Sequence, residues 1–423
     1  HDDRRHISSY VLATMKLLTK AKEEIRAAKE STPLLRQSLH GNSPPTLAHS
    51  LYVVATDSYI NVLLVCLPFA IYSYYAQWGD TAVFAFNFLT MIPLAKVIGD
   101  ATEEVAFHTG DTIGGLVNAT FGNAVEVIIA IFALREGQIS VVQASLLGSI
   151  LSNLLLVLGC CFVAGGVTQS VSKFNETSAS ANSSLLMVSA FAMLVPSYYQ
   201  YTTYDDKPET KAIVLGLSHI AAVFLLLMYM QLLYFQMKTH AHLFNSRDAT
   251  DEEEGGCDDD DDDDATDHSN MTLGSSIVIL GLATVLVSIL SEYLVASIDG
   301  FVASAHVSKS FVGIIILPIV GNAVEHMTAV RVALKHKMEL AMGVAVGSAT
   351  QISLFVVPVT VLAGWAMDQP MSLAFPTFEA VTYVTSVVIV YAIIVDGKSH
   401  WLEGSMLLTI YLFIAVALLW VHV

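Results

Sequence analysis

The chain has 423 residues, of which 54% are hydrophobic and only 14% are charged, and its mean hydropathy is +0.60. This composition is too apolar for a soluble protein of that length and predicts a membrane protein. The formal net charge of -18 comes largely from thirteen acids between Asp248 and Asp267, and with so acidic a balance nucleic acid is not an expected partner.

Apolar runs of roughly 17 to 25 residues, long enough to cross a bilayer, follow one another along the chain. A charged N-terminal arm over residues 1–58 precedes the first run. The sequence therefore predicts an all-α, polytopic membrane protein with about eleven transmembrane helices. The runs lie near 59–77, 81–107, 112–134, 138–165, 182–200 and 211–237 before the acidic stretch, and near 272–298, 309–334, 339–366, 376–395 and 401–422 after it.

Lys and Arg residues are distributed unevenly between the two sides of the membrane that the predicted helices define. With the N-terminal arm in the cytosol, fifteen Lys and Arg residues lie on the cytosolic side and four on the other. Cytosolic loops of membrane proteins carry such an excess. The pattern therefore places the N-terminus and the acidic loop, residues 238–271, in the cytosol, and the C-terminus across the membrane.

An internal repeat links the two parts of the chain. The segment Gly-Asn-Ala-Val-Glu at Gly122–Glu126 recurs unchanged at Gly321–Glu325, and at the same offset of 199 residues Gly148-Ser149 matches Gly347-Ser348. Each copy holds five runs, and because five is odd we expect the copies to enter the membrane from opposite sides. The predicted units are a peripheral helix over 59–77, a first repeat over 81–237 and a second repeat over 272–423.

The repeated segment supplies oxygen ligands. Within a helix, Asn123 and Glu126 are three residues apart and Gly122 and Glu126 four apart, so they share one face. Carboxylates, amide oxygens and carbonyls freed by glycine suit Ca2+, which takes 6 to 8 oxygen ligands. No arrangement of His and Cys suggests zinc. The second copy presents the matching set, Gly321, Asn322 and Glu325.

Two acids within a membrane do not stay bare. An ionised carboxylate there costs at least ~2.5 kcal/mol on the insertion scale, and two that lie close together repel each other. When Ca2+ leaves Glu126 and Glu325, protons can replace it on the same oxygens. We infer that this competition couples the two fluxes in an antiporter with alternating access, without enzymatic chemistry and without a bound cofactor.

Polar residues on the next run of each copy lie close to the motif in sequence. Each of them is either a ligand oxygen or a hydrogen-bonding link between helices, and the sequence leaves both interpretations open. These residues are Ser149, Ser152 and Asn153 in the first copy, and Ser348 and Gln351 in the second.

Other polar residues in the runs are candidates for gating or proton transfer. Glu103 and Glu104 end the second run, where an acid can also be simply solvated, and Glu292 lies deeper in the seventh. His326 follows the second motif directly. Lys96 either extends toward the interface or pairs with an acid.

The acidic loop is a candidate site for regulatory Ca2+. The alternative is a solvated linker, because like charges repel and no EF-hand spacing is present. The candidate residues are Glu252, Glu253, Glu254, Asp258, Asp259, Asp260, Asp261, Asp262, Asp263 and Asp264.

These features resemble the cation/proton exchanger branch of the Ca2+/cation antiporter superfamily, and within it the fungal vacuolar exchangers. The resemblance covers residues 59 to 422 and rests on the two motifs, on the runs NATFGNAVE and QASLLGSILSNLLLVLG (143–159), and on the acidic loop. It implies eleven spans, loading of an acidic organelle with Ca2+ across the vacuolar membrane, and Glu126 and Glu325 as central ligands. The positions that match the family at or near that site are Gly122, Asn123, Gly321, Asn322, Ser149, Ser348 and Gln351.

Alternative functions are weighed against this one. A Na+-coupled exchanger needs further oxygen ligands, and Ile352 stands at the position that matches Asn153. A passive divalent cation channel is a second alternative. The presence of one glutamate in each inverted half argues against it. An intramembrane hydrolase lacks a nucleophile and base at helical spacing. The residues do not separate Ca2+ from Mn2+, since both favour carboxylate and carbonyl oxygens.

Overall fold

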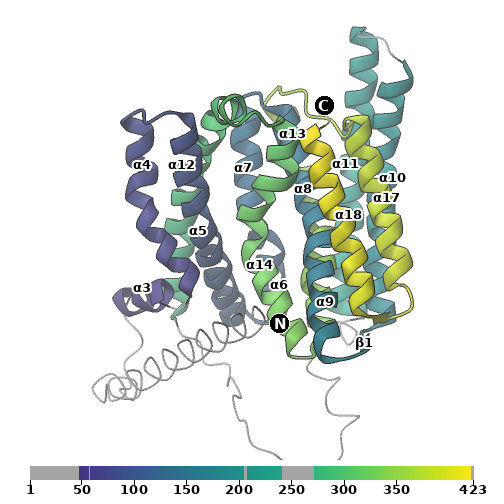
Figure 1. The fold of residues 1–423 in the computed structure, drawn as a ribbon, viewed down its shortest axis with the longest axis horizontal. Coiled ribbons are helices and arrows are strands. Elements are labelled where there is room, and N and C mark those ends of the chain that lie inside the picture. The colour runs from purple at the N-terminus through teal and green to yellow at the C-terminus, as the bar shows by residue number, and fades with distance from the viewer. Residues whose placement is uncertain (1–46, 57, 204–206, 241–270, 421–423) are drawn as a thin grey trace, which may run out of the picture. The chain divides into compact units, whose positions relative to one another are not determined.

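Helices make up almost all of the described chain in the computed structural model (Figure 1). The structure describes residues 47–56, 58–203, 207–240 and 271–420, which fall within one unit, Leu47–Val423. The predicted N-terminal arm up to residue 46 and the acidic residues 252–264 lie outside the described residues, so the interpretation of both remains a prediction.

The helices that carry the repeated motif lie toward the middle of the described chain (Figure 1). In Figure 1, α7, α8 and α14 lie between a group that contains α4, α5 and α12 and a group that contains α10, α11, α17 and α18. Up to residue 240 the elements are α3 Leu47–Thr56, the 3-10 helix η1 Tyr59–Cys66, α4 Leu67–Tyr75, α5 Asp80–Thr109, α6 Asp111–Phe121, α7 Ala124–Arg135, α8 Ile139–Leu151, the π-helix η2 Ser152–Val157, α9 Leu158–Thr168, β1 Ser172–Lys173, α10 Glu176–Thr203, α11 Pro208–Tyr234 and the π-helix η3 Phe235–Thr239. From residue 271 they are α12 Leu273–Ala305, α13 Lys309–Phe311, the π-helix η5 Val312–Ile316, α14 Leu317–Leu334, α15 Met338–Gln351, the π-helix η6 Ile352–Val356, α16 Val357–Ala366, α17 Thr377–Ile394, β2 Lys398–Ser399 and α18 Trp401–Trp420.

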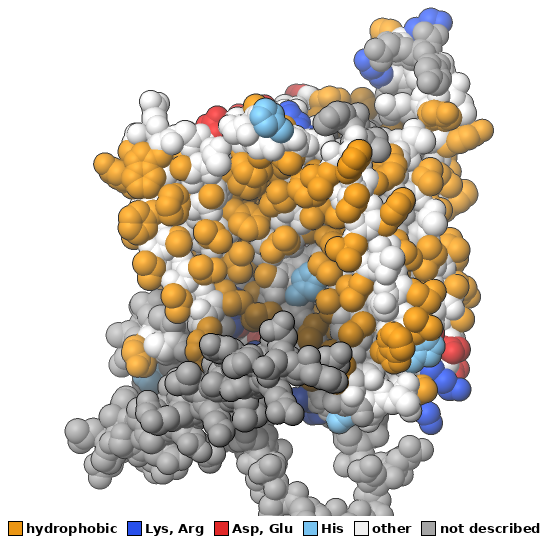
Figure 2. Space-filling model, viewed as in Figure 1, with side chains coloured by type: hydrophobic (Ala, Val, Ile, Leu, Met, Phe, Trp, Pro, Cys, Tyr) orange, Lys and Arg blue, Asp and Glu red, His pale blue; other side chains and the backbone are white. Residues whose placement is uncertain are grey.

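Nine helices of the described residues are long and apolar enough to cross a bilayer. They correspond to nine of the eleven predicted runs. The run near 59–77 instead forms a shorter apolar segment, Tyr59–Tyr75, and the run near 112–134 is interrupted between α6 and α7. In Figure 2, hydrophobic side chains cover the middle of the described surface and charged side chains gather toward its two ends. The fold is therefore that of an all-α polytopic membrane protein.

The two sequence copies form corresponding elements. In each copy a long helix, α8 or α15, continues through a π-helix, η2 or η6, into α9 or α16. The contacts correspond as well, because α9 packs against α18 and α16 packs against α11, while α7 packs against α12 and α14 against α5. These features support the predicted duplication. The inverted relation of the copies and the domain boundaries remain predictions.

The repeated five-residue segment adopts two different backbones. In the second copy, Gly321–Glu325 lies inside the continuous helix α14. In the first copy the helix stops at Phe121 and resumes at Ala124. Asn123 therefore precedes α7, with φ -111° and ψ 23°, whereas the sequence predicts that it lies inside a helix. Since the five residues are identical, their surroundings decide which backbone forms.

Helix α8 crosses the rod formed by α13, η5 and α14 at close range, because glycines meet the backbone of the other helix. A Cβ atom on Gly148 would lie 2.5 Å from the Cα and carbonyl oxygen of Ile314, and a Cβ on Gly313 would overlap Ala144. Small residues at such crossings let membrane helices approach closely. We call this contact the glycine crossing.

Gly148→Ala should destabilise the protein, because the obstructing atoms of Ile314 belong to the backbone and the helices must separate. Overpacking of this kind costs about 1–3 kcal/mol. We expect a lower midpoint when the purified protein in detergent is heated and the remaining monodisperse fraction is measured. Gly281→Ala on α12 is the control, since its Cβ meets nothing within 4 Å. Equal midpoints for the two variants would contradict the glycine crossing.

Candidate cation-binding site

Glu126 and Glu325 lie on two of the three central helices, α7 and α14, and neither is exposed. Their carboxyl groups are close enough to interact electrostatically. Oε1 of Glu126 lies against Gly321, since a Cβ on that glycine would overlap the oxygen. Gly321 precedes Glu325 by about one turn of α14. The structure thus brings the two carboxylates to the same part of the interior.

A small cavity of about 10 Å³ adjoins Glu126. On that measure it has about the volume that one water molecule needs. Polar atoms enter the cavity from α7 through Glu126, from α8 through Ser145 and Ser149, and from α14 through the backbone of Gly321. Apolar side chains close the remainder: Ile129, Leu146 and Leu317.

Three hydrogen bonds join the two sequence copies around the acids. Asn123 Nδ2 donates to Gln351 Oε1 at 3.0 Å. Asn153 Nδ2 donates to Ser348 Oγ at 3.0 Å. The third bond runs from Asn322 Nδ2 to the carbonyl oxygen of Ser149 at 3.2 Å. These three bonds pair six of the predicted neighbours of the glutamates, that is, all of them except the two glycines and Ser152. In this conformation Ser348 and Gln351 act as links between helices.

Several oxygens around Glu325 have no hydrogen-bond donor among the described residues. They are Glu325 Oε2, Asn322 Oδ1 and Asn153 Oδ1, and each is buried. The Asn153 amide and the Ser348 hydroxyl lie within hydrogen-bonding reach of the Glu325 carboxyl. Buried oxygens without a donor are costly, and a hard cation or a proton satisfies them. The described residues contain no group of three or more His, Cys, Asp and Glu, so neutral oxygens must complete any cation site here.

The candidate gating acids are not part of this cluster. Glu103 lies on an exposed position of α5, where the charged side chains that act on it are Asp100, Lys96 and Glu104. Glu292 occupies an exposed position of α12 beside Tyr293. His326 does follow Glu325 on α14, and its Nε2 is buried without a hydrogen-bond partner among the described residues.

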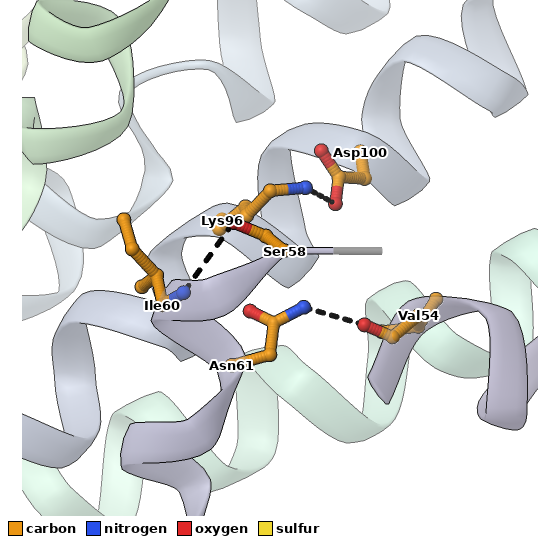
Figure 3. Close-up of polar contacts among 6 residues, drawn as sticks. All are labelled: Val54, Ser58, Ile60, Asn61, Lys96 and Asp100. Carbon is orange, nitrogen blue, oxygen red and sulfur yellow. Dashed lines mark hydrogen bonds and ion pairs between the residues drawn. The ribbon is translucent and has the colours of Figure 1, made fainter. Parts of the chain in front are cut away.

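The structure decides between the two interpretations of Lys96. Its ammonium group pairs with Asp100, one turn further along α5, at 2.5 Å (Figure 3). Figure 3 also shows Asn61 of η1, which donates to the carbonyl oxygen of Val54 at 2.5 Å. The pair joins residues four apart on one helix, as i,i+4 spacing allows. Lys96 is therefore a structural ion-pair partner.

One buried acid lies outside the predicted set. Glu379, in the first turn of α17, is 2% exposed, and its Oε1 accepts a hydrogen bond from Ser310 at 2.8 Å. The signal that points to it in the sequence is a lone acid within the apolar run near 376–395. The predicted cation site does not require it, because it has no counterpart at the repeat offset, where Ser180 stands.

Comparisons with known proteins place the chain among cation transporters. The family model described as sodium/calcium exchanger protein matches residues 80–238 and 275–420. The chain is 41% identical to a vacuolar calcium ion transporter of Schizosaccharomyces pombe, over 86% of this chain and 85% of that protein. It is 41% identical to a Ca(2+)/H(+) antiporter of Aphanothece halophytica, over 84% of this chain and 94% of that protein. A crystal structure of the selenium-substituted Ca2+/H+ antiporter YfkE superposes with a TM-score of 0.69 at 33% identity, covering 86% of this chain and 99% of that one.

Proposed function

Because the chain belongs to the sodium/calcium exchanger protein family, a family of transporters, we propose that it is a secondary antiporter that exchanges Ca2+ for H+ across a vacuolar membrane. The observation that carries the proposal is the pair Glu126 and Glu325, which meets across the two sequence copies amid buried oxygens that lack donors. Similar proteins named Ca2+/H+ antiporters support the choice of ions.

In the proposed mechanism, Ca2+ and protons compete for the carboxyl oxygens of Glu126 and Glu325. Ca2+ requires both carboxylates ionised, and the side-chain oxygens of Asn123 and Asn322 are the neutral donors nearest to them in sequence. When Ca2+ departs, protons neutralise the acids, because a bare anionic pair within the membrane is disfavoured. The site can then change the side of the membrane to which it opens either with Ca2+ bound or with both acids protonated. Because the two ions compete for the same oxygens, their fluxes are linked.

Two further parts of the proposal concern the membrane sides. We place the N-terminus and the acidic loop in the cytosol, on the charge bias of fifteen to four. Residues 252–264 then face cytosolic Ca2+, for which their carboxylates are a candidate regulatory site.

Sealed vesicles that contain the purified protein test the proposal directly. With acid inside and Ca2+ outside, we expect Ca2+ uptake that a protonophore abolishes and that replacement of external potassium by Na+ leaves unchanged. Vesicles without protein are the control. Uptake that survives collapse of the pH gradient would exclude proton coupling. Uptake that requires internal Na+ would favour the Na+-coupled alternative. The structure argues against that alternative, because buried Ile352 occupies a position where an oxygen ligand would be needed.

A further inference from the structure

Glu379 is a buried carboxyl group away from the cation site. It lies in the first turn of α17 and is 2% exposed. Ser310, at the start of the rod of α13, η5 and α14, donates to its Oε1 at 2.8 Å, while Oε2 has no hydrogen-bond partner among the described residues. The hydrogen bond therefore joins α17 to the first residues of the rod, which carries Glu325 further along, in α14.

Among the described residues, Ser310 is the group that bonds the Glu379 carboxyl, and no charged side chain acts on it, Lys211 of the neighbouring pocket included. Lys309, next to Ser310, instead binds Asp299 at 2.7 Å and Gln138 at 3.0 Å. Gln143 of α8, which lines one pocket together with Thr377 of α17, is uncharged. Tyr383, one turn further along α17, shares its hydroxyl with Ser189 of α10 at 2.6 Å. An ionised Glu379 would thus be a buried charge with one neutral donor, an arrangement that is strongly disfavoured.

The rod of α13, η5 and α14 connects the residue that binds Glu379 to the cation site, so its length separates the two. Ser310 and Gly321 are eleven residues apart, which corresponds to about 16 Å along a helix. Between them lies the glycine crossing, where Gly313 and Ile314 pack on Ala144 and Gly148 of α8. Glu379 therefore sits beyond a tightly packed contact that closes this route to the cation site.

A pocket of about 730 Å³ lies on the same side of the glycine crossing, lined in part by Gln143, Lys211 and Thr377. Thr377 is two residues before Glu379. Most of residues 370–376, which we call the strap, also line this pocket, and the strap holds buried Leu373 and Phe375. Side chains of three helices bind the strap backbone: Gln143 of α8 donates to Ser372 and Ala374, Ser197 of α10 contacts Leu373 and Phe375, and Ser218 of α11 accepts from Leu373.

We propose that Glu379 is a positioning residue that links protonation on the side of this pocket to closure of that side of the exchanger. When neutral, it packs between α17 and Ser310 and keeps the glycine crossing closed. When ionised, it requires water and favours separation of α17 from the rod. The predicted topology puts this side in the vacuole, so an acidic interior favours closure after protons have loaded. This inference rests on the proposed Ca2+/H+ exchange.

The test compares Glu379→Gln with the unmodified protein in vesicles, at a series of internal pH values and constant external pH. Glutamine keeps the size and the acceptor for Ser310 but cannot ionise. We expect a maximal Ca2+ uptake rate about five-fold lower and a shallower dependence on internal pH, because closure no longer needs a proton. Glu379→Asp should regain the steep dependence. Glu209→Gln, an exposed acid in the first turn of α11 at the same end, should match the unmodified protein.

Ser310→Ala provides a second measurement if Glu379→Gln does not yield folded protein. Loss of the donor to Oε1 destabilises the ionised form, so the internal pH profile should move to higher pH. Unchanged profiles in both variants, or in whichever variant folds, would overturn the role of Glu379 while leaving Ca2+/H+ exchange intact. Absence of pH-driven uptake in the unmodified protein would instead overturn the proposed function itself.

Discussion

Ca2+ uptake driven by a pH gradient should fall to background when either Glu126 or Glu325 is replaced by glutamine. Each substitution removes one of the two carboxylates that meet across the sequence copies. Ca2+ then loses a charged ligand from a site whose other oxygens are neutral, and the proton that exchanges with it loses its acceptor. Uptake into acid-loaded vesicles measures both losses at once, and single variants suffice because each acid is required.

The matched control is Glu136→Gln, which changes the exposed residue that ends the same helix as Glu126. It should transport as the unmodified protein does. Binding of Ca2+ in detergent, measured at neutral pH without a gradient, separates loss of the site from loss of movement. Full uptake by Glu126→Gln or by Glu325→Gln would rule out a site built from two carboxylates.

Gly321→Ala should inactivate a folded protein. The new Cβ would overlap Oε1 of Glu126, which is the free end of a flexible side chain and not backbone. The carboxylate can therefore turn away at small cost to stability, within about 1 kcal/mol, but it leaves the position in which it meets Glu325. We expect uptake at least about tenfold lower, corresponding to about 1.4 kcal/mol of lost interaction, with an unchanged thermal midpoint.

Gly343→Ala on the neighbouring helix α15 controls for the general effect of alanine, because its Cβ meets nothing within 4 Å. It should leave uptake and midpoint unchanged. If Gly321→Ala transports at the unmodified rate, then Glu126 does not need the position it occupies against α14. If Gly321→Ala is inactive but also has a much lower thermal midpoint, the loss of uptake reflects disrupted packing and not displacement of the Glu126 carboxylate.

The sequence was most informative where hydropathy and repetition act together. The runs of apolar residues gave the membrane fold because the bilayer leaves helices few alternatives, and nine of them appear as predicted. The repeated segment led to Glu126 and Glu325 because unpaired acids are rare inside membranes. Whether these two acids bind Ca2+ is still a prediction, although the structure places them together.

Other features could not be predicted, since they depend on contacts between distant parts of the chain. The break between α6 and α7 occurs in only one of two identical segments, so no local rule separates them. The hydrogen bonds from Asn123 to Gln351 and from Ser310 to Glu379 join residues whose proximity the sequence does not reveal. Lys96 is the opposite case, because Asp100 four residues later is a local partner.

The two-residue strands β1 and β2 have a mechanical consequence. They pair antiparallel, with Ser172 opposite Ser399, and so pin the connection after α9 to the connection before α18. Helix α18 has 20 residues and spans about 30 Å. If it swings about the pinned end by ~10°, its far end travels ~5 Å. Because the near end of α18 is tied in this way, any small tilt of the helix would displace mainly its far end.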